Sequence, residues 1–172
     1  MKLGSIVRPS EALPGRILIR SDGSRTHLLF ATNVIDPNNK SERMVVMFRE
    51  EAPAGYVHAS ALRESFWDIT DIAEFRVDLL GHCFTQEHER HGDVYLTPDG
   101  HVTMAGDYRG QGGGFGYIHF DMKTGDERQV EHWKCARFQS WEIVVPQGPS
   151  EQPRTLYKWT PKKGAEASAS YS

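Results

Sequence analysis

The chain has 172 residues, of which 38% are hydrophobic and 25% charged, the composition of a globular protein that can bury a core of its own. A mean hydropathy of −0.54 and the lack of any apolar run of about 20 residues exclude a long membrane-spanning helix. The first residues lead into strand-like sequence without an apolar signal region, so we expect a soluble, cytoplasmic protein with no membrane partner.

Charge and cysteine content narrow the classes of partner. The net charge of −3 argues against a protein that neutralises phosphates broadly, so we do not expect nucleic acid as a partner. Residues 1–50 carry eight Lys/Arg against five Asp/Glu, whereas residues 51–100 carry three against ten. This acidic middle either steers a basic partner or a cation, or simply solvates a polar face. Cys83 and Cys135 are too few for a disulfide framework and too far apart for a paired-cysteine zinc motif.

Short apolar runs separated by turn residues predict four strands in the first fifty residues. The turns contain Pro14-Gly15, Asp22-Gly23 and Pro37-Asn38. Strands this short, joined this tightly, favour a small curled sheet or an SH3-like barrel over residues 1–58. The four predicted strands cover residues 6–8, 16–20, 26–31 and 43–48.

One short helix is predicted after this lobe. Ser60 is a suitable N-cap for a helix over residues 61–67, where Leu62 and Phe66 lie at helical spacing. The pattern favours a helix packed on a sheet, near the boundary between two lobes.

The fold class predicted for the whole chain is mainly β, or α+β, with this helix and an antiparallel meander over residues 59–145. The alternation is clear where Ile118 and Phe120 share one face of a strand and His119 and Asp121 share the other. Residues 146–172 have the composition of a linker and a mobile tail.

The segment from Gly81 to Asp93 concentrates groups that bind metal ions. It contains three His, one Cys, two Glu and one Asp, and imidazole with carboxylate suits zinc, iron, nickel or copper. If the strands pair in sequence, His82, His101 and His119 all project from the face opposite the core. A solvated hairpin and a solvated sheet face are the alternative interpretations. The candidate metal ligands are His82, His88, His91 and His119, and the candidate bases are Glu87 and Asp121.

A glycine-rich loop follows Arg109. It lacks the Lys-Ser/Thr pair of a phosphate-binding loop, and a strand follows it where such a loop needs a helix. A flexible hairpin loop that contacts a partner is the remaining functional interpretation. The candidate binding residues are Arg109, Gly112, Gly113, Gly114 and Phe115.

Two functional hypotheses follow, and they leave open whether the chain is an enzyme. The first is a non-enzymatic cytoplasmic module that binds a protein partner, such as an immunity protein or an accessory protein, with no cofactor. The second is an enzyme that uses a divalent transition metal held by histidines and carboxylates on a β-scaffold. A metal enzyme requires these groups to converge at one place, whereas a binding module presents a broad exposed patch.

Overall fold

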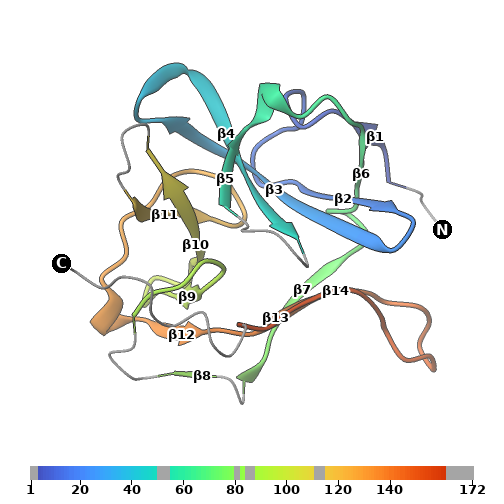
Figure 1. Cartoon of the computed structure of the whole chain (residues 1–172). Helices are drawn as coiled ribbons and strands as arrows, with labels where there is room; N and C mark the ends of the chain where they lie inside the picture. Colours follow the sequence, from blue (N-terminus) through green and yellow to red (C-terminus); the bar gives the residue numbers. More distant parts are fainter. Residues whose placement is uncertain (1–3, 50–54, 80–81, 84–87, 111–114, 162–172) are drawn as a thin grey trace.

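The computed structural model describes residues 4–49, 55–79, 82–83, 88–110 and 115–161, and it is built from three antiparallel sheets (Figure 1). Helical structure within these ranges is confined to short 3-10 turns, among them η1 (Ala59–Ala61) and η3 (His132–Lys134). No helix in this part of the chain has the length and apolarity to cross a membrane. The prediction of a mainly β protein is confirmed.

The largest sheet has six strands in the order β1-β6-β2-β3-β4-β5. Its centre is the long hairpin of β3 and β4, whose middle residues are buried on both faces because a core lies on each side of the sheet. The strands are β1 (Ile6–Val7), β2 (Ile17–Asp22), β3 (Arg25–Asp36), β4 (Asn39–Arg49), β5 (Gly55–His58) and β6 (Phe66–Asp68).

The second sheet has five strands in the order β11-β10-β9-β12-β8, and the third has three in the order β14-β13-β7. The five-stranded sheet contains β8 (His82–Cys83), β9 (Val94–Leu96), β10 (Val102–Arg109), β11 (Phe115–Asp121) and β12 (Ala136–Phe138). The three-stranded sheet contains β7 (Glu74–Val77), β13 (Trp141–Val145) and β14 (Arg154–Trp159).

The four strands predicted in the first fifty residues are present, and the turns between them lie where the glycines and prolines indicated. The six-stranded sheet stays open within the described ranges, since its order ends at β1 and β5 and no pairing joins these two strands. The alternative of an SH3-like barrel is therefore wrong.

The predicted helix over residues 61–67 is also wrong. Ser60 donates its hydroxyl hydrogen bond to Glu42 instead of capping a helix. Phe66 and Asp68 are buried while Trp67 is exposed, which is the two-residue period of a strand. β6 completes the sheet by pairing with β1 on one side and β2 on the other, and these backbone bonds replace those a helix would make.

The meander prediction holds only for β9, β10 and β11, which pair in sequence. β7 does not pair with β8 but with β13, so that Phe75 lies opposite Ile143 and Val77 lies opposite Trp141. Phe75 and Trp141 are in ring contact, with centroids 5.3 Å apart, and this apolar contact lies between strands that are distant in sequence.

One core joins the three sheets. Phe30 of the six-stranded sheet contacts Trp141 of the three-stranded sheet and Phe120 of the five-stranded sheet, with ring centroids 5.9 and 6.0 Å apart. A second, smaller cluster around Leu18 and Leu29 covers the opposite face of the six-stranded sheet. The division of the chain into residues 1–58, 59–145 and 146–172 stays a prediction, although β14 lies in the last segment.

Candidate metal centre

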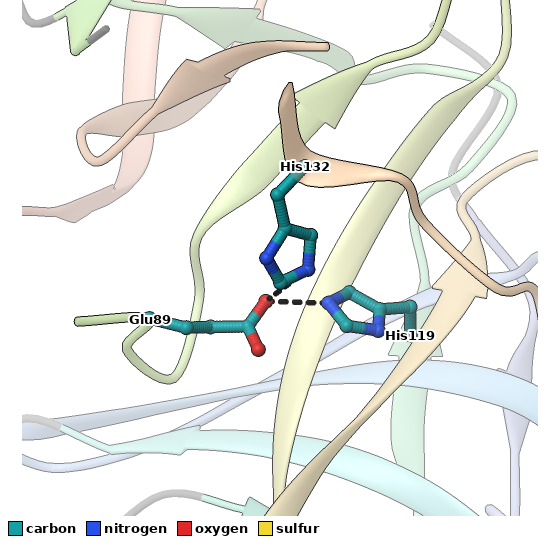
Figure 2. A group of neighbouring side chains, drawn as sticks. All are labelled: Glu89, His119 and His132. Carbon is teal, nitrogen blue, oxygen red and sulfur yellow. Dashed lines mark hydrogen bonds and ion pairs between the residues drawn. The ribbon is translucent and has the colours of Figure 1, made fainter. Parts of the chain in front are cut away.

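Three side chains from separate parts of the chain converge beside the five-stranded sheet. Glu89 precedes β9, His119 lies in β11, and His132 begins η3. One potential ligand atom of each lies within 4.8 Å of those of the other two, and Figure 2 shows the two imidazoles directed at the Glu89 carboxylate. Glu89 and His119 are partly buried while His132 is exposed, so the group lies at the surface with one side open to solvent.

The position of His119 follows from the alternation of β11. Phe120 enters the core, so His119 projects from the other face of the sheet. The residue opposite His119 on β10 is Ala105, whose small side chain leaves room for the imidazole.

His132 reaches the same face because the chain turns back after β11. The Arg128 amide donates a hydrogen bond to the His119 carbonyl at 2.9 Å, and Phe120 and Glu127 form an isolated antiparallel bridge. This return brings the start of η3 over β9, where the His132 ring stacks on Tyr95 with centroids 5.0 Å apart.

Glu89 belongs to an irregular segment that is anchored at several points. The Arg137 guanidinium donates to the His88 carbonyl at 2.7 Å, and the Gly92 amide donates to Ala105 at 2.8 Å. Trp141 Nε1 donates to the Gly92 carbonyl at 2.9 Å. These bonds fix the backbone on both sides of Glu89.

The Glu89 carboxylate is the electrostatic centre of the group. Its Oε1 lies 2.5 Å from His119 Nε2 and 3.5 Å from His132 Nε2, and it accepts a hydrogen bond from the Tyr95 hydroxyl at 2.8 Å. Burial raises the pKa of Glu89, but the hydrogen bond and charge of His119, the Tyr95 hydroxyl and the His132 charge outweigh it, so the pKa is lowered. Glu89 is therefore a carboxylate anion at neutral pH.

Tyr95 contacts all three side chains of the group. Its ring is buried, stacks on His132 and meets His119 edge-on, with centroids 5.6 Å apart. Burial and the Glu89 charge both raise the pKa of Tyr95, so the hydroxyl stays protonated. It donates a hydrogen bond to the Glu89 carboxylate. Orientation of a ligand by such a neighbour is common in protein metal sites.

A buried ion pair lies next to this group. Arg137 Nε donates to Asp93 Oδ2 at 2.9 Å, and a second guanidinium nitrogen contacts the same oxygen. Burial raises the pKa of Asp93 to about 6, against the opposing effect of Arg137. The pair connects β12 to the end of the Glu89 segment.

Of the four predicted metal ligands, the structure places only His119 in this group. His88 is exposed. His91 is partly buried against Phe48, and its Nδ1 accepts a hydrogen bond from the Asp107 amide at 3.0 Å. His82 pairs through its backbone with Phe138, but its side chain lies outside the described residues.

The remaining predicted site residues are dispersed. Asp121 accepts hydrogen bonds from His101 and Arg128 and does not join the Glu89 group. Arg109 ends β10, and β11 begins at Phe115. Glu87, the loop glycines Gly112, Gly113 and Gly114, and the side chain of Phe115 lie outside the described residues.

The sequence placed Glu89 inside the predicted metal-binding segment without naming it as a ligand, and it did not single out His132 or Tyr95. Tyr95 carried a usable signal, because strand alternation puts it on the face opposite Val94, away from the core. Glu89 and His132 precede or begin irregular elements, and no periodicity predicts where such side chains point.

Comparison with known proteins found no similarity: no protein family matches the chain, and neither a curated protein nor a solved structure resembles it.

Proposed function

We propose that the chain is a metal-dependent enzyme in which Glu89, His119 and His132 hold one divalent transition metal ion. The observation that carries this proposal is the convergence of one carboxylate and two imidazoles at a single point. Two histidines and one carboxylate form the ligand set of catalytic zinc sites and of non-haem iron(II) sites.

The distances suit an ion after a small adjustment. Ligands about 2.0 to 2.2 Å from zinc in a tetrahedron lie roughly 3.4 Å from one another. The distance from Glu89 Oε1 to His132 Nε2 is 3.5 Å, and the shorter distance to His119 Nε2 is that of a direct hydrogen bond. An ion would replace this hydrogen bond when the His119 ring moves back by about 1 Å.

Three protein ligands favour catalysis over a purely structural role. Structural zinc sites close their coordination with four protein ligands, whereas three ligands leave a position for water or substrate. His132 is exposed, so this position is accessible to solvent. A metal ion held in this way acts as a Lewis acid or activates a bound water molecule.

The test is metal binding by chelator-treated protein, titrated with Zn²⁺, Co²⁺ and, without oxygen, Fe²⁺ in a calorimeter. We expect one equivalent of at least one of these ions to bind the wild-type chain. Glu89→Gln, His119→Ala and His132→Ala should each weaken its affinity by at least about tenfold, because each removes a ligand.

The matched control is His88→Ala. This variant removes an exposed imidazole from the same segment and should keep the wild-type affinity. Failure of all three ions to bind, or equal affinity in the wild type and the His119 and His132 variants, would contradict the proposal.

Binding of a protein partner stays a second proposal with less support. Ile6 and Trp67, 60% and 45% exposed, face each other where β1 forms an edge of the six-stranded sheet. This exposed apolar pair, on a strand of two residues, is the surface feature that supports the second proposal.

A further inference from the structure

Asp107 lies on the same face of the five-stranded sheet as the candidate metal centre. β10 and β11 pair so that Ala105 lies opposite His119 and Asp107 lies opposite Tyr117. Alternate residues of a strand share a face, so Asp107 lies one cross-strand pair from the proposed ligand His119. Asp107 is close to the centre but is not one of its three proposed ligands.

The Asp107 carboxylate is buried without full hydrogen bonding. The residue is only 9% exposed, and Oδ1 has no hydrogen-bond partner among the described residues. Arg109 Nε lies 3.6 Å from Oδ2, beyond hydrogen-bond distance, and that side chain is 67% exposed. Other buried aspartates have donors: Asp93 accepts from Arg137 and a backbone amide.

An unpartnered buried carboxylate oxygen is costly and uncommon in folded proteins. Thr103 lies four residues before Asp107 in β10 and therefore on the same face of the sheet. Its Oγ1 is also buried without a hydrogen-bond partner in the described part of the chain. These two oxygens leave unfilled hydrogen-bonding capacity on the face that holds the metal centre.

A shared neighbour connects Asp107 with the metal centre. Burial raises the pKa of Tyr117, and the negative charges of Asp107 and Glu89 raise it further. Asp107 lies opposite this phenol across the strand pair, and Glu89 acts on it electrostatically from a different segment.

We propose that the ligand of this centre binds the metal ion through an oxygen atom and donates a hydrogen bond from an adjacent N–H or O–H group to Asp107 Oδ1. This inference rests on the proposed metal-dependent function. Amides, hydroxamates and hydroxy ketones belong to the chemical class it names. The unpartnered carboxylate oxygen selects for the donor and disfavours ligands that carry a negative charge there.

The experiment uses acetohydroxamate as the probe, which offers an oxygen to the metal and an N–H or O–H donor beside it. Its affinity is measured for metal-loaded wild type and for the isosteric variant Asp107→Asn, with acetate as a probe that lacks the donor. We expect Asp107→Asn to weaken acetohydroxamate by about tenfold or more, to leave the metal ion bound as in wild type, and to bind acetate at least as tightly as wild type does.

Two controls separate this role from a structural one. The melting temperature of Asp107→Asn should equal or exceed that of wild type, because the substitution removes a buried charge without a donor. Asp22→Asn changes an exposed carboxylate in the six-stranded sheet and should bind both probes as wild type does.

The outcomes are distinct. Equal acetohydroxamate affinity in wild type and Asp107→Asn, or no binding to the metal-loaded wild type, overturns the role of Asp107 while the metal centre stands. Loss of the metal ion in Asp107→Asn also overturns this role, because it would show that Asp107 is itself a metal ligand. Failure of the wild type to bind metal overturns the proposed function itself.

Discussion

His91 shows how a single side chain connects the candidate centre to the core. It lies two positions after Glu89, stacks on Phe48 with centroids 4.4 Å apart, and meets Trp159 edge-on at 5.7 Å. Burial lowers its pKa to about 4, against the opposing effect of the Met47 backbone. The imidazole is therefore neutral at pH 7, and its ring contacts with Phe48 and Trp159 hold the Glu89 segment against the core.

This burial predicts loss of stability in mild acid. Below pH 6.5 the unfolded chain protonates His91, whereas the folded chain does not do so until about pH 4, so the free energy of unfolding falls between these values. The loss attributable to His91 is about 3 kcal/mol. Urea unfolding of chelator-treated protein at several pH values measures it.

The His91→Phe variant isolates this contribution. Phe keeps the ring contacts, so the variant should lose stability less steeply between pH 6.5 and pH 4, even if it is less stable at pH 7. His27→Ala, which changes a partly exposed histidine, is measured alongside for comparison. An unchanged slope in His91→Phe would show that burial of this imidazole does not contribute to the acid sensitivity.

At the scale of elements, the turn before β9 depends on a residue without a side chain. Gly92 has a φ of 84°, and a Cβ there would lie 2.6 Å from Trp159 Nε1 and 2.9 Å from Phe48 Cε1. Gly100, in the β9–β10 turn, has the same φ, but a Cβ there meets nothing within 4 Å. The two positions share their backbone conformation and differ in available space.

Alanine substitution separates these two effects. Gly100→Ala should lower the free energy of unfolding by about 1 to 2 kcal/mol through backbone strain alone. Gly92→Ala should cost about 1 to 3 kcal/mol more, because the methyl group also overpacks the core. Chemical denaturation measures both values, and equal losses would contradict the crowding at Gly92.

The regular elements were more predictable from sequence than the connections between them. Glycine and proline turns located β1 to β4, and alternation put His119 on the face away from the core. The helix prediction failed because Leu62 and Phe66 fit a helical period, while the backbone bonds of β6 depend on strands far away in sequence. Glu89 and His132 could not be assigned to the centre, since their side chains are positioned by long-range contacts of Arg137, Trp141 and Tyr95.

At the scale of the whole molecule, the shared core makes the three sheets energetically dependent on one another. Phe30 packs against all three sheets. Its ring contacts Phe48 within the six-stranded sheet, Trp141 in the three-stranded sheet and Phe120 in the five-stranded sheet. A residue so placed stabilises all three sheets at once, and residues 1–58 and 59–145 both supply its contacts.

We therefore expect a single cooperative unfolding transition. Tryptophan fluorescence and far-ultraviolet circular dichroism should give coincident denaturation curves for the wild type. Phe30→Ala should shift both curves together by about 3 to 5 kcal/mol, the usual cost of removing a buried phenylalanine ring. Two separated transitions would show instead that the predicted lobes fold independently.

The pairing of β7 with β13 also has a consequence for synthesis of the chain on the ribosome. Val77 finds its partner only when Trp141 has emerged, so β7 spends at least several seconds without its neighbour at the usual rates of about 5 to 20 residues per second. Contacts this distant in sequence also slow folding once the chain is released. During that interval the apolar side chains of Phe75 and Val77 are available to chaperones, so production of this protein in cells should depend on chaperone supply more than its size suggests.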